Sequence, residues 1–188
     1  EHATCQRYVF ERDRHRYLVT RALVRTTLSR YADVEPRAWR FVANEHGRPS
    51  ICTPFAPGLE FNLAHSCGMI TCLVGRDREL GVDVEDAARE VEIMLVARGV
   101  FAPSEVAWLD GLPSAEQPRA FYEIWTLKEA YIKARGMGRA LPLGEFAFSF
   151  DGDRPRIDFE PSFDGSARAW QFELLHPTPR HLVAVAIR

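Results

Sequence analysis

The chain contains 188 residues, of which 46% are hydrophobic and 27% are charged. These values are typical of a folded protein, and the length suffices for one large domain or two small ones packed together. Such a chain can bury a core without disulfides or a structural metal. Its net charge of -2 disfavours a protein that coats nucleic acid, because such a protein would carry a basic excess.

Membrane insertion and secretion are also disfavoured. No apolar run approaches the roughly 20 residues that a membrane-spanning helix needs, and no segment has the pattern of a signal peptide. The four cysteines form neither a CxxC pair nor a Cys/His metal-ligand spacing. They predict free thiols in a reducing compartment, and we therefore expect a cytoplasmic location.

The first long element is expected over residues 11–31, which contain no glycine or proline and predict one helix. Arginines are concentrated in and before this segment, and their surplus suggests an anionic ligand near the start of the chain. Arg14, Arg21 and Arg25, however, fall beside the apolar side of the helix. The alternative is that they cover this side with their methylene stems.

The rest of the chain predicts further strands and two helical regions. A short strand at 39–43 precedes a turn at Gly47, Arg48 and Pro49. Strands are expected at 60–64, 69–75, 80–85, 146–150, 156–159, 169–175 and 181–187. Helices are expected at 91–111, with a break near Gly99 and Pro103, and at 116–135, where Gly136 is a favoured C-terminal stop.

Each half of the chain therefore contains a long helix and several antiparallel strands. This pattern predicts an α+β protein of two similar lobes, residues 1–80 and 81–188, related by a pseudo-two-fold axis. A cleft between the lobes is the expected ligand site. No internal sequence repeat supports the symmetry, which depends on the order of elements alone.

The segment Gly81-Val82-Asp83-Val84-Glu85 is the first candidate for chemistry. Residues two apart on a strand point to the same face, so Asp83 and Glu85 present two carboxylates side by side while the valines face a core. Adjacent like charges repel unless a positive group lies between them, and hard oxygen ligands suit Mg²⁺ or Mn²⁺. The pattern is short, and it is also consistent with a strand end that faces water.

The second candidate is the helical segment from Trp125 to Gly136, with the sequence WTLKEAYIKARG. Trp125, Glu129 and Lys133 are spaced by four residues and share one face of the helix. From spacing alone, Glu129 and Lys133 could equally be a surface pair on an amphipathic helix. A third segment, residues 61–66, ends a strand in His65 and Ser66, but no order of Ser, His and Asp indicates a hydrolase triad.

Together these segments resemble the 4′-phosphopantetheinyl transferase superfamily, in particular its monomeric surfactin-type (Sfp-like) branch. The family pattern W-[ST]-x-K-E-A-x-x-K-x-x-G is complete from Trp125 to Gly136, and G-x-D-x-E is complete from Gly81 to Glu85. Two weaker matches lie upstream. The turn at Gly47, Arg48 and Pro49 is similar to the family's G-K-P, and residues 62–66 are similar to its N-x-S-H-S.

The resemblance implies transfer of the 4′-phosphopantetheine arm of coenzyme A to a serine of an acyl or peptidyl carrier protein, by a cytoplasmic monomer that binds neither nucleic acid nor membrane. It implies that the metal, Mg²⁺ or alternatively Mn²⁺, is held by Asp83, Glu85 and Glu129. Glu129 and Lys133 are the implied catalytic residues, and Lys128 and Lys133 would neutralise phosphate charge. The implied coenzyme A-binding residues are Arg48, Pro49, His65, Lys128, Lys133 and Arg16.

The resemblance further implies that residues 1–80 form the nucleotide side of the cleft and residues 81–188 the metal and phosphoryl-transfer side. Two positions depart from the family pattern. Ala64 replaces the first serine of S-H-S, and Arg48 replaces the lysine of G-K-P while keeping its charge. The alternatives left open are a metal-dependent phosphohydrolase of a nucleotide diphosphate and a non-catalytic module that binds coenzyme A or a carrier protein.

Overall fold

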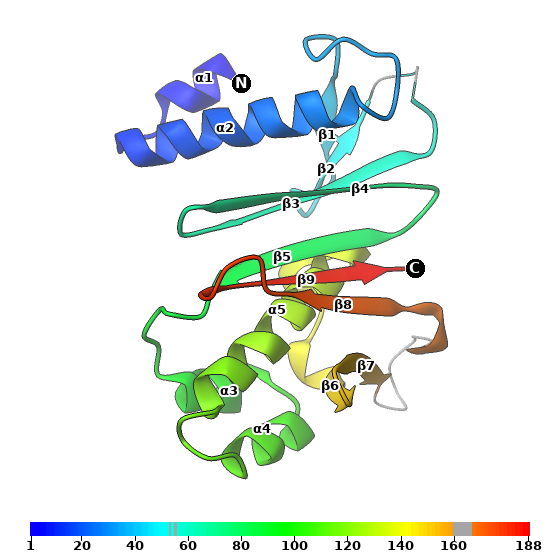
Figure 1. Cartoon of the computed structure of the whole chain (residues 1–188). Coiled ribbons are helices and arrows are strands. Elements are labelled where there is room, and N and C mark those ends of the chain that lie inside the picture. The colour runs from blue at the N-terminus through cyan, green and yellow to red at the C-terminus, as the bar shows by residue number, and fades with distance from the viewer. Residues whose placement is uncertain (53, 55, 160–166) are drawn as a thin grey trace.

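The N-terminal half of the chain forms a long helix over two small antiparallel sheets. The computed structural model describes residues 1–52, 54, 56–159 and 167–188. In this half the elements are α1 (His2–Gln6), α2 (Glu11–Leu28), β1 (Phe41–Ala43), β2 (Pro49–Ile51), β3 (Leu59–Ser66) and β4 (Met69–Arg76). Figure 1 shows α2 lying across the β3–β4 hairpin, with the β1–β2 hairpin at one end.

The C-terminal half contains a second long helix and a three-stranded antiparallel sheet of order β5-β9-β8. Its elements are β5 (Leu80–Asp86), α3 (Ile93–Val100), α4 (Pro103–Asp110), α5 (Gln117–Arg135), β6 (Phe146–Asp151), β7 (Arg154–Phe159), β8 (Gln171–Leu175) and β9 (His181–Ile187). Strands β6 and β7 form a separate hairpin. In Figure 1 the shorter helices α3 and α4 lie below α5, on the side away from α2.

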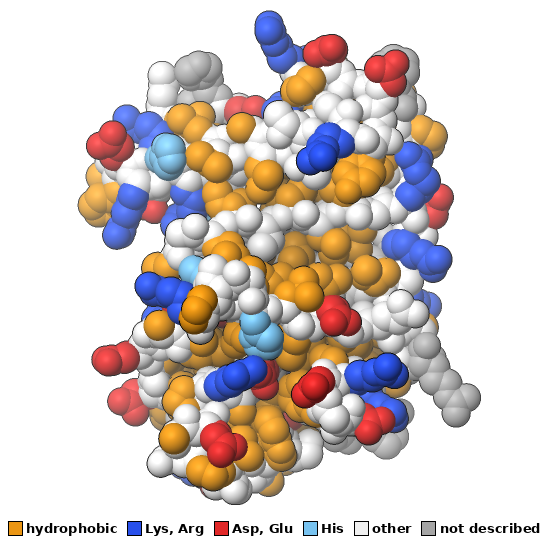
Figure 2. All heavy atoms as spheres, in the orientation of Figure 1, with side chains coloured by type: hydrophobic (Ala, Val, Ile, Leu, Met, Phe, Trp, Pro, Cys, Tyr) orange, Lys and Arg blue, Asp and Glu red, His pale blue; other side chains and the backbone are white. Residues whose placement is uncertain are grey.

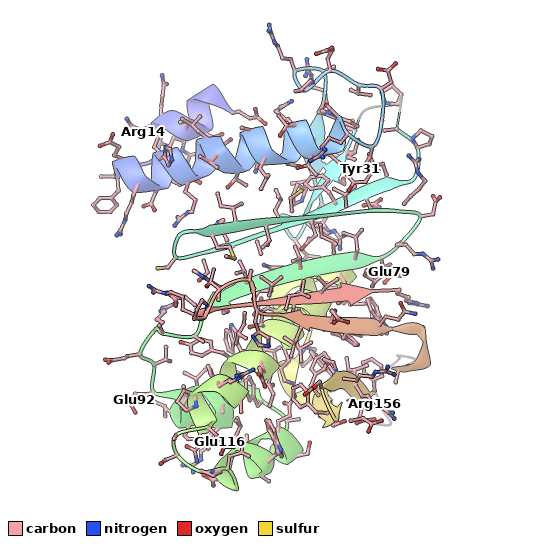
Figure 3. All side chains as sticks on the ribbon, viewed as in Figure 1. Arg14, Tyr31, Glu79, Glu92, Glu116 and Arg156 are labelled. Atoms are coloured by element: carbon pink, nitrogen blue, oxygen red, sulfur yellow. The ribbon has the colours of Figure 1, made fainter. Side chains whose placement is uncertain are left out.

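The N-terminal core forms where the apolar side of α2 meets the hairpins. Val24, Leu28, Trp39 and Phe61 are almost wholly buried there. The predicted helix runs three residues too far, because the chain turns after Leu28 and leaves Tyr31 57% exposed. In Figure 3 the label of Tyr31 lies at the end of α2 opposite Arg14.

The C-terminal core depends on an unusually close approach of α5 to its sheet. Ala130 and Ala134 of α5 are buried against β5, where a side chain at Gly81 would collide with the helix backbone. Its Cβ would lie 3.0 Å from the Cα of Ala134 and closer still to the carbonyl oxygen of Ala130. Glycine at position 81 therefore brings β5 and α5 into contact.

The two halves meet along β3 and β5, which lie against each other without forming a common ladder in the part of the chain that is described. The side-chain oxygen of Asn62 on β3 accepts a hydrogen bond of 2.9 Å from the backbone N–H of Val82 on β5. Ala64, Val82 and Val84 form a small apolar cluster with Val183 of β9 between the halves. The valines of the β5 motif thus face a core, as their alternation predicts.

The predicted α+β class is confirmed, since each half contains one long helix packed on antiparallel strands. Sequence patterns missed the short elements α1 and β2 and three 3-10 turns, η1 (Gly138–Ala140), η2 (Leu143–Glu145) and η3 (Ala167–Ala169). They placed the other strands within a few residues of their observed bounds. The pseudo-two-fold relation between the halves stays a prediction. Among the described residues, none of the helices has both the length and the apolar character needed to cross a bilayer.

Candidate active site

A cavity of about 900 Å³ lies between the two halves of the molecule. The N-terminal half contributes the β1–β2 turn, including Gly47, Arg48 and Pro49, together with Asn62 and Leu63 of β3. The C-terminal half contributes the exposed face of α5, the end of α3 and residues 141–144. A cleft is therefore present between the halves. The motif from Trp125 to Gly136 lines it directly, whereas the motif from Gly81 to Glu85 lies behind this lining, with Asp83 in contact with Lys133.

Asp83 lies at the centre of β5 and is only 6% exposed. Burial raises its pKa to about 6, Lys133 opposes this shift, and the nearby charge of Glu129 adds to it. Among the described residues, Asp83 Oδ2 is buried and finds no hydrogen-bond donor. An ionised carboxylate in this position is costly unless a positive group approaches it.

Lys133 approaches the other oxygen of the same carboxylate. It lies in the last turn of α5, and its Nζ is 2.6 Å from Asp83 Oδ1. Glu129, one turn earlier on α5, lines the cleft beside Lys133. The helix and strand motifs, separated by about forty residues in the chain, are thus brought into one site by the packing of α5 on β5.

Glu85, the second carboxylate of β5, is oriented by Trp125. The indole Nε1 donates a 3.1 Å hydrogen bond to Glu85 Oε1, and the ring stacks on Phe121 with a centroid distance of 5.9 Å. Burial raises the pKa of Glu85, and the neighbouring charge of Asp83 raises it further. Trp125 therefore holds one oxygen of Glu85 and leaves the carboxylate close to Asp83.

The predicted metal ligands Asp83, Glu85 and Glu129 have the chemistry of a cation site. Among the residues that the structure describes, no group of three His, Cys, Asp or Glu side chains is already gathered as a metal site. The charge of Glu129 nevertheless raises the pKa of Asp83, and the charge of Asp83 raises that of Glu85. Asp83 Oδ2 is buried without a hydrogen-bond donor among the described residues. Oxygen donors of this kind fit a hard divalent cation.

Lys128 occupies a different environment from the one predicted for it. Its side chain is 1% exposed, and its ammonium group is 2.8 Å from Glu105 Oε2 and donates to the carbonyl oxygens of Leu143 and Phe146 at 2.8 and 2.6 Å. An ammonium group has three donors, so all three are used inside the protein. The predicted contact of Lys128 with a phosphate of coenzyme A would therefore have to replace one of these three internal contacts.

Glu105 was not among the predicted site residues, although it completes this buried group. Its Oε1 accepts from the backbone N–H of Phe148 at 2.7 Å and its Oε2 from that of Ala102 at 2.9 Å. Burial raises the pKa of Glu105 and lowers that of Lys128, while each partner's charge opposes the shift in the other. The pair joins the start of α4 to α5 and to the segment that forms the rim of the cleft. The available signal was Pro103-Ser104-Glu105, which indicated only a helix start.

Arg48 lies in the cleft wall, but its guanidinium is engaged by the C-terminal half. Nη1 donates to the carbonyl oxygens of Lys133 and of Ala134, the latter at 2.6 Å, and Nη2 donates to that of Leu80 at 3.1 Å. Burial lowers the pKa of Arg48. The predicted contact of Arg48 with a phosphate thus competes with three contacts to carbonyl oxygens.

The other predicted ligands of coenzyme A lie on the N-terminal half. Pro49 lines the cleft at the start of β2. His65 has an exposed side chain near the end of β3, where partial desolvation by its neighbours and then the charge of Arg16 lower its pKa. Arg16 forms a 2.9 Å ion pair with Asp13. Neither His65 nor Arg16 lines the cavity itself, although Figure 2 shows Lys and Arg side chains near the N-terminal end of α2.

Both halves of the chain match models of known protein families. Residues 79–186 match the model of the 4′-phosphopantetheinyl transferase superfamily, and residues 1–78 match a model of the N-terminal part of 4′-phosphopantetheinyl transferases. The chain belongs to the 4′-phosphopantetheinyl transferase superfamily. The match over residues 79–186 includes β5 and α5 and the carboxylates that their packing brings together.

Curated relatives in this superfamily are similar over most of the chain. The 4′-phosphopantetheinyl transferase HetI of Nostoc sp. is 33% identical over 188 residues, which are 100% of this chain and 76% of that protein. The 4′-phosphopantetheinyl transferase Sfp of Bacillus subtilis is 32% identical over 149 residues, 79% of this chain and 64% of that protein. The chain thus spans about two thirds to three quarters of the length of these transferases.

Two solved structures are similar to part of this chain. The holo-[acyl-carrier-protein] synthase of Thermotoga maritima has a TM-score of 0.48 at 22% identity, covering 57% of this chain and 61% of that chain. The synthase of Bacillus anthracis, solved in complex with CoA (3′,5′-ADP), has a TM-score of 0.46 at 20% identity, covering 57% and 92%.

Proposed function

We propose that this protein transfers the 4′-phosphopantetheine group of coenzyme A to a serine hydroxyl of an acyl or peptidyl carrier protein and releases 3′,5′-ADP. Family membership supports the reaction class. The observation that carries the proposal for this chain is the meeting of Asp83, Glu85, Glu129 and Lys133 beside one cleft. This arrangement gathers carboxylate oxygens, which can hold a metal, and one lysine ammonium group, which can offset the charge of a bound pyrophosphate.

In this proposal Asp83, Glu85 and Glu129 hold a Mg²⁺ ion, for which Mn²⁺ could substitute. When bound, the metal supplies positive charge that neutralises the pyrophosphate oxygens. The unpartnered Oδ2 of Asp83 supports its assignment as a ligand, since it is the buried oxygen in greatest need of a cation. Trp125 supports Glu85 as a ligand by fixing one of its oxygens.

Lys133 is the proposed partner of the transferring phosphoryl group. Its Nζ now contacts Asp83 Oδ1, and its side chain is 29% exposed, so it can turn toward a substrate in the cleft. A lysine there offsets the charge that spreads over the phosphoryl oxygens as the bond to 3′,5′-ADP breaks. Transfer of this kind makes little demand for covalent help and depends on alignment and charge.

Glu129 is the proposed general base. As the serine oxygen forms its bond to the β-phosphorus of coenzyme A, the hydroxyl proton passes to the Glu129 carboxylate, directly or through a water molecule, and the P–O bond to 3′,5′-ADP breaks. The position of Glu129 on the cleft wall, one helical turn before Lys133, supports this role. Glu129 cannot be fully committed to the metal and also accept the proton, so its two roles compete.

We further propose that residues 1–80 receive the nucleotide end of coenzyme A, with Pro49, His65 and Arg16 as contacts, and that residues 81–188 perform the transfer. The basic side chains near the start of α2 support an anionic ligand at this end. A monomeric state and a cytoplasmic location belong to the same proposal.

Intact-mass spectrometry of an apo carrier protein tests the proposal directly. Incubation with this protein, coenzyme A and Mg²⁺ is expected to add one phosphopantetheine group, about 340 Da, and a chelator is expected to prevent the gain. Glu129→Gln should abolish the gain. Glu123→Gln, on the same helix but in a surface pair with Arg119, is the matched control and should preserve it. Coenzyme A breakdown without a mass gain would indicate a phosphohydrolase, and neither change would indicate a binding module.

A further inference from the structure

The turn between β1 and β2 crosses the boundary between the halves and covers the end of α5. Asn44 Nδ2 donates to the carbonyl oxygen of Gly136 at 2.9 Å. Arg48, at the other end of the same turn, donates to the carbonyl oxygens of Lys133, Ala134 and Leu80. The carbonyl oxygens of Lys133, Ala134 and Gly136, all near the helix end, thus receive donors from a turn about ninety residues earlier in the chain.

The turn is itself held in one conformation. Asn44 Oδ1 accepts hydrogen bonds from the backbone N–H groups of His46 and Arg48 at 3.0 and 2.8 Å, and the backbone N–H of Asn44 donates to the carbonyl oxygen of Arg48 at 2.9 Å. Gly47 has a φ of 83°, a left-handed conformation that favours glycine. The side chains of Asn44 and Arg48 therefore point at α5 from a rigid support.

Elementary electrostatics explains why an arginine fits this position. The last carbonyl groups of a helix lack intrahelical partners and carry partial negative charge, so a cation with several donors stabilises them. The planar guanidinium can serve three carbonyl oxygens at once, which an ammonium group on a flexible stem does less well. Glu60 and Glu79 also act on Arg48, and both raise its pKa. Their negative charge makes the surroundings less suited to a phosphate.

Lys133 belongs to the helical turn that receives these contacts. Its carbonyl oxygen accepts from Arg48, while its Nζ reaches Asp83 on β5. We infer that Arg48 and Asn44 are positioning residues: they cap the last turn of α5 from the other half of the molecule and so hold Lys133 in place for transfer. This inference rests on the proposed function for its catalytic consequence. Arg48 then acts through the helix and does not bind the 3′-phosphate of coenzyme A.

Steady-state kinetics with two substrates separates these roles. 3′-Dephospho-coenzyme A lacks only the 3′-phosphate of coenzyme A, which is the group that Arg48 would contact if it bound a phosphate. The variants are Arg48→Met, Arg48→Lys and Asn44→Ala, and the matched control is Arg76→Met, which removes an exposed arginine bonded to the carbonyl oxygen of Pro57.

If Arg48 and Asn44 position Lys133, Arg48→Met and Asn44→Ala lower kcat by a similar factor for both substrates, roughly 10-fold or more. The ratio of the two KM values stays as in the wild type, and Arg48→Lys recovers kcat only in part. A higher KM for coenzyme A alone in Arg48→Met, with wild-type kinetics in Asn44→Ala and Arg48→Lys, would overturn the inference. Arg76→Met should behave as the wild type.

Amide hydrogen exchange tests the cap in a measurement that needs no transfer activity. A wrong inference about the cap can therefore be told apart from a wrong proposal for the function. Loss of the cap should speed exchange at residues 133–136 in Asn44→Ala and Arg48→Met, while exchange in the middle of α5 stays unchanged. Unchanged exchange at the helix end in both variants would overturn the inference even if the wild type transfers the group. Arg48→Lys serves where Arg48→Met does not fold, because it keeps the charge and one or two of the contacts.

Discussion

Lys133 Nζ lies 2.6 Å from Asp83 Oδ1, although the two residues are 50 positions apart in the chain and belong to different elements. The contact leaves the second oxygen of the same carboxylate buried without a hydrogen-bond donor among the described residues. A half-neutralised buried carboxylate of this kind supports the proposal that a second cation binds beside it. Its neutralisation by Lys133 alone does not return the pKa of Asp83 to its ordinary value, since that pKa remains at about 6.

Replacement of the Asp83 carboxylate should lower transfer activity and leave the protein folded. We expect Asp83→Asn to lower transfer by at least 100-fold, since it removes a proposed metal ligand while keeping the side-chain shape. The variant should remain folded, because a neutral amide is easier to bury than a carboxylate. Transfer by intact mass and unfolding by circular dichroism measure the two effects. Asp110→Asn, in an exposed pair with Arg98, is the control, and near-normal transfer by Asp83→Asn would contradict the metal assignment.

Gly81 should tolerate no side chain. An added Cβ would collide with the backbone of α5 at Ala130 and Ala134, and backbone atoms cannot move aside as a flexible side chain can. We expect Gly81→Ala to lower the free energy of unfolding by about 3 kcal/mol or more, measured by urea titration. Gly99→Ala provides the contrast, because a Cβ there meets no atom within 4 Å and should be neutral or stabilising by up to about 1 kcal/mol. Similar stability of the two variants would refute the close-approach argument.

Trp125 should act through its N–H more than through its ring. Trp125→Phe keeps an aromatic ring against Phe121 and removes the donor to Glu85. We expect a stability change of only about 1 kcal/mol and a 10- to 100-fold higher Mg²⁺ requirement for transfer, since ligand orientation is lost. A magnesium titration of the initial rate measures this. Trp108→Phe, at a ring contact with Phe150 away from the carboxylates, should leave the titration unchanged.

The buried pair of Glu105 and Lys128 should be sensitive to loss of one partner. We expect Glu105→Gln to lower the free energy of unfolding by about 3 to 5 kcal/mol, because it leaves the Lys128 ammonium buried without its counter-charge. The double variant Glu105→Gln/Lys128→Met should be less destabilised than the sum of the two single variants. Corresponding replacements in the exposed pair of Arg98 and Asp110 should change the free energy of unfolding by about 0.5 kcal/mol or less. Additive effects at the buried pair would show that the charges are not coupled.

The ion pair of Asp86 and Arg180 should make part of the folding stability sensitive to acid. Asp86 is 2% exposed and accepts from Arg180 Nε at 2.9 Å, and this contact holds the pKa of Asp86 below its usual 3.8. Because the folded form holds the proton less tightly than the unfolded form, the contribution to stability is complete well above pH 3.8. It is lost as the pH falls through the lowered pKa.

Unfolding titrations of the wild type and Asp86→Asn, from neutral pH to about pH 3, measure this component. The difference in stability between the two proteins should shrink toward the acid end. Glu173→Gln on the partly exposed strand β8 is a control of the same charge change and should run parallel to the wild type. A difference that is constant with pH would contradict the role of the Asp86 carboxylate.

Local patterns were sufficient to predict the elements and part of the site. Alternation placed Asp83 and Glu85 on one face of β5, and helical spacing placed Glu129 beside Lys133, because both depend only on backbone geometry. The orientation of Lys128 could not be predicted in this way. It is decided by Glu105, which lies 23 positions earlier and meets α5 only after the helices pack. Arg48 poses the same difficulty, since its carbonyl partners belong to the other half of the chain.

The boundary between β3 and β5 has a consequence for the size of the cleft. Strands within each sheet are joined by ladders of backbone hydrogen bonds, whereas the two sheets contact each other through side chains such as Asn62 and Ala64. A small rotation of one half against the other would therefore leave the strand pairings of the described residues intact. Such a rotation would change the width of the cleft, because residues of both halves line it.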